Sequence, residues 1–357
     1  MKKLRQSNIE LLRIVSMLLV LMVHANFTSI GVPSRDLMFS SPGQFTFRVL
    51  VEFVSVLCVD IFVIISGWFS IRPSFIGVCN YLWQCLYFSA GIYVVLLLCG
   101  IASFSADGLL GIFYLDSDEW FVKAYLALMI LAPVLNAFVD HASRRQLAAV
   151  LIAFFIFQTV FSFRGAAAFI QSGYSAFSFV GLYLLARYMR LYCHNIAISQ
   201  SLGIFTASVL ANAVLFSVDV WLKTDFATGI CMSYANPLVI IGAMSLTIIF
   251  SRLDFGTNKF INYIAGSCFA VYLLHCSHWL FAPVYCTTVA HFYSSFNGLL
   301  CVAVIFLFIL AVFVLAVLLD WPRRLLWQFI TSRINERSHS VGNSAGVQRG
   351  EISSPLR

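Results

Sequence analysis

Long apolar runs recur along most of the chain, and short polar connections separate them. A run of roughly twenty residues forms a helix of ~30 Å, which matches the hydrocarbon thickness of a bilayer. We therefore predict an all-α polytopic membrane protein with about ten transmembrane helices. Their approximate bounds are 9–30, 48–70, 76–100, 120–140, 146–163, 172–190, 197–217, 229–250, 260–282 and 298–319.

The charged residues of the connections form two sets that alternate along the chain. The first set is basic: Lys2, Lys3, Arg5, Arg72, Arg144, Arg145, Arg187, Arg190, Arg252, Lys259, Arg323 and Arg324. The second set mixes both signs: Arg35, Arg48, Arg164, Lys223, Asp36, Asp107, Asp116, Asp118, Asp219 and Asp225. Because basic connections remain in the cytoplasm, we expect both termini to be cytoplasmic.

The chain ends in a segment of different character. Residues 1–325 carry the apolar runs and are predicted to form one membrane domain. Residues 326–357 are polar, rich in Ser and Gly, and without periodicity. Such a composition buries too little apolar surface to fold alone, so we predict a disordered cytoplasmic tail.

Composition narrows the class of protein further. With 61% hydrophobic and 10% charged residues, the chain is too apolar for a soluble protein of 357 residues. The net charge of +7 follows from the basic cytoplasmic connections, so we expect no nucleic-acid partner. The ten cysteines contain no CxxC pair and no zinc-type spacing. We expect no metal ion and no bound cofactor.

The first apolar run contains three ionisable residues, Glu10, Arg13 and His24. A charge at the bilayer centre costs ~2.5–3.5 kcal/mol on insertion scales. On a helix, Arg13 and His24 lie about three turns and ~16 Å apart on one face, and Glu10 can pair with Arg13. This stripe predicts an internal cavity. The alternatives are that Arg13 extends to the headgroups and that His24 is a neutral core residue.

Three further segments combine polar or aromatic residues with apolar runs. Asp60 and Ser66-Gly67 lie in VDIFVIISGWF, where the small pair is also typical of a helix-packing notch. Trp120 begins another span, where an ordinary interfacial tryptophan is the alternative. Tyr272 and His275 share a face of a later helix, with His278 next on it. Histidines placed in this way could bind a metal ion, although we expect none here.

These segments together resemble the acyltransferase-3 family of bacterial membrane acyltransferases, over residues 5–320. The family's R-x10-H element is similar to Arg13 and His24, with an acidic residue three before the arginine. Its FFxxSGF/Y, WYL…LxP and YLxH elements resemble IFVIISGWF, WFVKAYLALMILAP and YLLH. The chain has no room for a fused esterase-like domain, so it resembles the stand-alone type.

The resemblance implies a membrane O-acyltransferase domain over residues 1–325 in the bacterial cytoplasmic (inner) membrane. Its donor would be cytoplasmic acyl-CoA, with acetyl-CoA the simplest case and a longer acyl group such as succinyl open. Its acceptor would be a hydroxyl of a surface polysaccharide or of a lipid-linked glycan precursor. A glycan transporter or flippase without acyl chemistry is the rival function, and a degenerate sensor or structural protein is another.

The chemistry of acyl transfer suggests a role for each residue of the polar stripe formed by Glu10, Arg13 and His24. A sugar hydroxyl needs a base to attack a thioester, and the imidazole of His24 can serve, either directly or through an acyl-histidine. Arg13 would stabilise the donor phosphates or the developing oxyanion. Glu10 would pair with Arg13 and keep it in place. Asp60 is an alternative partner for Arg13 or His24.

The remaining candidate residues would contact substrates. Tyr272 and His275 would line the acceptor side or orient other groups. Ser66 and Trp120 belong to the family-like elements named above. Arg72 is the basic residue that remains after the SGW element, where family members often carry a basic cluster.

Overall fold

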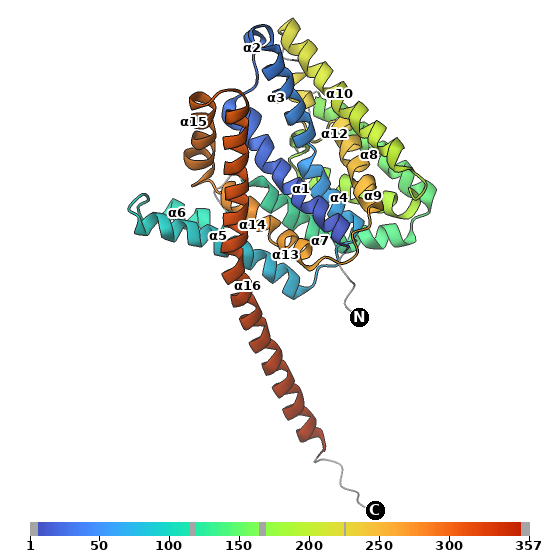
Figure 1. The fold of residues 1–357 in the computed structure, drawn as a ribbon. Coiled ribbons are helices and arrows are strands. Elements are labelled where there is room, and N and C mark those ends of the chain that lie inside the picture. Colours follow the sequence, from blue (N-terminus) through green and yellow to red (C-terminus); the bar gives the residue numbers. More distant parts are fainter. Residues whose placement is uncertain (1–5, 115–118, 164–168, 225, 351–357) are drawn as a thin grey trace, which may run out of the picture.

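The computed structural model describes residues 6–114, 119–163, 169–224 and 226–350, with side chains up to residue 333. All elements within these ranges are helices (Figure 1). The prediction of an all-α chain is thus confirmed for the described residues. Several charges used above to orient the spans lie outside them: Lys2, Lys3, Arg5, Asp116, Asp118, Arg164 and Asp225.

The elements follow one another as a series of long and short helices. They are α1 Ser7–Val23, η1 His24–Ile30, α2 Arg35–Ser40, α3 Pro42–Ser55, α4 Cys58–Trp68, α5 Phe75–Leu98, α6 Ala106–Ile112, α7 Trp120–His141, α8 Arg144–Phe163, η2 Gln171–Gly173, α9 Ala176–Tyr192, α10 Ile198–Leu222, α11 Thr228–Cys231, α12 Pro237–Arg252, α13 Lys259–Ala265, α14 Cys268–His275, η3 Phe281–Cys286, α15 Thr287–Ser295 and α16 Gly298–Gly350.

Seven helices of the described chain are long and apolar enough to cross a bilayer: Ser7–Ile30, Pro42–Trp68, Phe75–Leu98, Trp120–His141, Arg144–Phe163, Ile198–Leu222 and Gly298–Arg333. The other three predicted spans correspond to the shorter α9 and α12 and to the broken pair α13–α14. A total of ten spans and the cytoplasmic side of the termini therefore remain predictions. Figure 1 shows α1 beginning at the end of the bundle from which α16 projects.

Three spans are interrupted in mid-course. The first passes from α-helix to π-helix at His24, where α1 ends and η1 begins. The second span is interrupted at Val56 and Leu57, between α3 and α4. The third is interrupted at Gly266 and Ser267, which separate α13 from α14. Irregular backbone at membrane depth is tolerated where it is buried in protein or lines a cavity, and π-turns occur frequently at functional sites.

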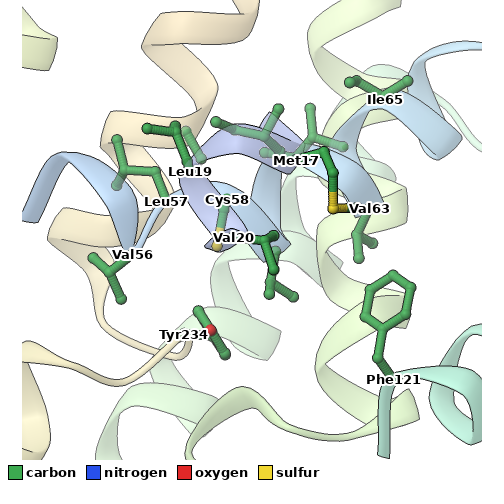
Figure 2. Packing of buried hydrophobic residues seen from close by; sticks show 14 of the residues in the cluster. Met17, Leu19, Val20, Val56, Leu57, Cys58, Val63, Ile65, Phe121 and Tyr234 are labelled. Carbon is green, nitrogen blue, oxygen red and sulfur yellow. The ribbon is translucent and has the colours of Figure 1, made fainter. Parts of the chain in front are cut away.

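The core is centred on α1 and α4. Figure 2 shows its packing, with Met17 and Val20 of α1 near Val63 of α4. A buried hydrogen bond joins the two helices, because the Ser16 hydroxyl donates to the Cys58 carbonyl at 2.6 Å. Such contacts hold membrane helices together, where lipid provides no hydrophobic driving force between them.

Gly67 of the SGW element sits where α4 meets α9. A Cβ atom at this position would lie 2.6 Å from the Tyr183 carbonyl oxygen and 2.8 Å from the Ala186 Cβ. Only glycine fits so close an approach. The helix-packing interpretation of the small pair therefore holds for Gly67.

Helix α16 passes the predicted boundary between residues 325 and 326 without a break. It continues as helix to Gly350, and its side chains are described up to Arg333. The division into a membrane domain at 1–325 and a separate tail at 326–357 is not tested by this helix and stays a prediction.

Candidate active site

A cavity of about 810 Å³ lies inside the bundle. Its walls come from α1, η1, α3, α4, α5, α7, α13, α14 and η3. Five of the predicted site residues line it: Arg13, His24, Ser66, Trp120 and Tyr272. The internal cavity expected from the polar stripe of the first span is thus present, and residues more than 250 positions apart in sequence meet in it.

Arg13 lies on the α1 wall with Glu10 beside it. The Arg13 Nε atom is 3.5 Å from Glu10 Oε2, and the carboxylate is buried while about a third of the arginine side chain is exposed. Within the described residues the pair is an ion pair without a well-aligned hydrogen bond. The guanidinium therefore keeps donors for a ligand in the cavity, while Glu10 offsets the burial of its charge.

His24 forms a hydrogen-bonded chain with His275. The His275 Nδ1 atom lies 2.6 Å from the Val271 carbonyl oxygen, which can only accept, so Nδ1 carries the proton. In a neutral ring the His275 Nε2 atom is then an acceptor, and it lies 3.1 Å from His24 Nδ1. His24 Nδ1 donates, and the lone pair on its Nε2 atom has no hydrogen-bond partner among the described residues. Because His24 lines the cavity, this places a base at the wall.

Ser66 and Tyr272 lie on neighbouring walls. The Ser66 hydroxyl is 2.9 Å from the Tyr125 hydroxyl and also 2.9 Å from the Phe62 carbonyl, which can only accept its proton. Tyr272 packs against Phe121, with ring centroids 5.2 Å apart. Both residues therefore help to shape the cavity that Arg13 and His24 also line.

Trp120 begins α7 and forms an aromatic wall of the cavity rather than an isolated interfacial side chain. Its ring centroid lies 4.6 Å from that of Tyr174 and 6.1 Å from that of Tyr234, with which it stacks. Phe179 closes the cluster from α9 at 5.8 Å. Aromatic walls with a few polar groups are typical of ligand pockets.

The structure does not bring Arg72 or Asp60 into the cavity. Arg72 is exposed beyond the end of α4. Asp60 is fully buried in α4, and neither of its oxygens has a hydrogen-bond partner among the described residues. No ion pair joins Asp60 to Arg13 or His24 within that part of the chain. A substrate contact for Arg72 remains a prediction.

A buried polar cluster beside His24 was not anticipated from the sequence. Glu52 lines the cavity, and its Oε2 atom accepts a hydrogen bond from Asn26 Nδ2 at 2.9 Å. Asn26 Oδ1 in turn accepts from Arg48 Nε at 3.1 Å. Arg48 had been assigned to a connection. The four-residue spacing of Arg48 and Glu52 inside an apolar run was the available signal, since such a pair shares a helix face.

Glu119 was also missed, although it directly precedes Trp120. It lines the cavity and is buried. Its Oε1 atom accepts from the His278 backbone N–H at 3.0 Å, whereas Oε2 is buried without a partner among the described residues. An acidic residue at the start of a span is usually taken as an interfacial charge, which is why it attracted no assignment.

A second group of charges lies beside the Arg13 part of the cavity. Asp320 of α16 is fully buried and accepts from Arg323 Nε at 2.5 Å and from Arg324 Nε at 2.6 Å. Arg323 also donates to the amide oxygen of Asn80 at 3.0 Å, and Asn80 lines the cavity. Arg324 donates to the hydroxyl of Ser267, at the break between α13 and α14.

Comparison with known proteins gives the family. The model of the acyltransferase-3 family, described as an acyltransferase domain, matches residues 6–321. No curated protein and no solved structure matches the chain. The matched region contains every residue of the cavity wall. With helices apolar enough to cross a bilayer, the chain belongs to the acyltransferase-3 family and is a membrane acyltransferase that uses an acyl donor and an acceptor.

Proposed function

We propose that the protein is an O-acetyltransferase of the bacterial cytoplasmic membrane. It transfers an acetyl group from cytoplasmic acetyl-CoA to a hydroxyl of a surface polysaccharide or of its lipid-linked precursor. One observation carries the proposal: a histidine base oriented by a second histidine shares a cavity with an arginine about three helical turns away. That arrangement suits an anionic donor that must extend a reactive thioester to a base.

Positive charge supports binding of the donor at the Arg13 part of the cavity. Arg13, Arg323 and Arg324 face two carboxylates, those of Glu10 and Asp320, so one positive charge is left in excess. Guanidinium groups bind phosphates through paired hydrogen bonds. Coenzyme A carries its phosphates at one end and its thioester at the other, and the long pantetheine arm between them suits the ~16 Å from Arg13 to His24.

The reaction needs one proton to be moved twice. His24 Nε2 takes the proton of the acceptor hydroxyl while the oxygen attacks the thioester carbonyl. The new C–O bond forms, the C–S bond breaks, and the coenzyme A thiolate leaves with the proton from the imidazolium. His275 holds the Nδ1 proton of His24 throughout. Such general-base catalysis typically contributes 10²–10⁴-fold. An acyl-histidine route would use the same Nε2 atom.

The aromatic wall supports a carbohydrate acceptor. Trp120, Tyr174 and Tyr234 line the cavity with aromatic rings, which suit the C–H faces of a sugar. Glu119 adds an oxygen with no partner among the described residues. Glu52 adds a second carboxylate at the cavity wall near Phe27. Hydroxyl groups of a glycan can donate to both carboxylates.

The test is label transfer in membranes. Membranes that contain the protein, given radiolabelled acetyl-CoA and the glycan fraction of the host, should label the glycan, and membranes with His24→Ala should not. If neither membrane transfers label, and glycan crosses the membrane only where the protein is present, the protein is a transporter and the proposal is wrong.

A further inference from the structure

A cysteine thiol lies beside the histidine pair, so that three atoms able to coordinate a metal ion lie close together. Cys276 follows His275 at the end of α14, and its Sγ atom lies 3.2 Å from His275 Nε2 and 3.7 Å from His24 Nδ1. The two nitrogens are 3.1 Å apart. All three atoms lie within 4.8 Å of one another. The hydrogen-bonded pair used for catalysis is thus only part of the arrangement.

The spacing of the three atoms fits one small metal ion. Zinc binds imidazole nitrogen at ~2.0–2.1 Å and thiolate sulfur at ~2.3 Å with tetrahedral angles. The edges of such a tetrahedron are ~3.3 Å between two nitrogens and ~3.6 Å between nitrogen and sulfur. The three observed distances differ from these edges by at most a few tenths of an ångström, so small side-chain adjustments suffice.

The surroundings also suit a metal site. The Val271 carbonyl fixes the His275 proton on Nδ1, which leaves the Nε2 lone pair for a metal, as in known zinc sites. His275 is buried, whereas His24 and Cys276 are half-buried and line the cavity, so a fourth ligand position would open onto it. Two imidazoles and one thiolate favour zinc over magnesium or calcium, which prefer oxygen ligands.

We propose that His24, His275 and Cys276 bind one zinc ion and that the bound ion inhibits acyl transfer. Binding ionises the Cys276 thiol and releases one proton. The ion also occupies His24 Nδ1, so the proton of that ring moves to Nε2. Nε2 is the atom that must accept the hydroxyl proton, and the inhibition rests on the proposed function for this reason. Metal binding and base catalysis then exclude each other at one histidine.

The binding part is tested with cobalt, which replaces zinc and gives absorption bands for tetrahedral and thiolate coordination. Metal-free protein in detergent is titrated with Co²⁺ and then with Zn²⁺. We expect one Co²⁺ per chain with a sulfur-to-cobalt band that Zn²⁺ removes. Cys276→Ser should lose that band, and Cys268→Ser, which changes the cysteine at the start of α14, should keep it. No Co²⁺ binding, or an unchanged band in Cys276→Ser, would overturn the proposal.

The inhibition is tested by acyl transfer in chelator-treated protein with added Zn²⁺. We expect the parent protein to lose activity and to recover it with chelator, and Mg²⁺ to have no effect. In Cys276→Ser the Zn²⁺ concentration for half inhibition, relative to its own metal-free rate, should rise by at least about tenfold. Stimulation by Zn²⁺, or equal inhibition in both proteins, would contradict the inhibitory role.

The two measurements distinguish a failure of the proposed metal site from a failure of the proposed acyl-transfer function. Cobalt bound at Cys276 in a protein that transfers no acyl group with any donor would contradict the proposed function and leave the metal site intact. Acyl transfer without any metal binding would support the proposed function and remove the metal site.

Discussion

His24 Nδ1 lies 3.1 Å from His275 Nε2, although 251 residues separate the two in the chain. The contact joins the π-turn at the end of the first long helix to the last turn of α14. It places the proton of the neutral His24 ring on Nδ1, so that the lone pair of the ring is on Nε2. A residue that orients a base in this way is a positioning residue, and its loss should affect turnover rather than binding.

His275→Ala should lower kcat and leave KM for the acyl donor nearly unchanged. The His24 ring would lose the acceptor that holds its Nδ1 proton, so the productive tautomer and orientation would be less populated. We expect a loss of about 10–100-fold in kcat, smaller than that of His24→Ala. Steady-state kinetics with labelled acetyl-CoA give both parameters. A rise in donor KM at constant kcat would assign His275 to binding instead.

Arg13→Lys should weaken use of the donor although the charge is kept. Lysine cannot offer the planar paired donors that fit a phosphate. We expect KM for acetyl-CoA to rise by about tenfold and Arg13→Ala to raise it further, with little change for the acceptor. Arg35→Ala, on the short helix α2 and not among the residues that line the cavity, provides the control. An effect confined to acceptor KM would place Arg13 on the other substrate.

Arg324→Gln should affect full-length acetyl-CoA more than a truncated donor. S-acetylpantetheine lacks the nucleotide phosphates, so a phosphate-binding arginine cannot contribute to its KM. We expect KM for acetyl-CoA to rise several-fold and KM for the truncated donor to stay constant. Arg333→Gln, the same substitution further along α16, is the matched control. Equal effects on the two donors would show that Arg324 acts only through the buried Asp320.

Gly67→Ala should destabilise the protein. The added methyl group would lie 2.6 Å from the Tyr183 carbonyl oxygen, so α4 and α9 would have to separate. Overpacking of this kind costs about 1–3 kcal/mol, and a lower melting temperature in detergent would show it. Gly91→Ala is the control because a Cβ atom at Gly91 in α5 meets nothing within 4 Å. Equal melting of the two variants would remove the packing role.

The parts of the fold that follow from local pattern could be read from the sequence. Apolar runs gave the long spans, and the eleven-residue spacing placed Arg13 and His24 on one wall of a cavity. These features depend on the helix repeat alone. The broken spans could not be read in this way, because the π-turn at His24 and the interruption at Gly266 lie inside continuous apolar runs.

Residues whose importance comes from tertiary contacts were less accessible. The sequence cannot show that Cys276 reaches His24, since 252 residues separate them. Glu52 and Glu119 lie near the ends of predicted spans, where a charge is common, and their burial beside the cavity depends on how the helices pack. Family-like elements found Ser66 and Trp120, because these positions carry a recognisable local motif.

The most direct test of the central claim compares label transfer by the parent protein and by His24→Ala at equal abundance in the membrane. Loss of the base predicts a fall in transfer of at least about 10²-fold. His291→Ala, which changes an exposed histidine of α15, should transfer label at the parent rate. Transfer by His24→Ala at the parent rate would contradict the account, because the cavity would then work without its base.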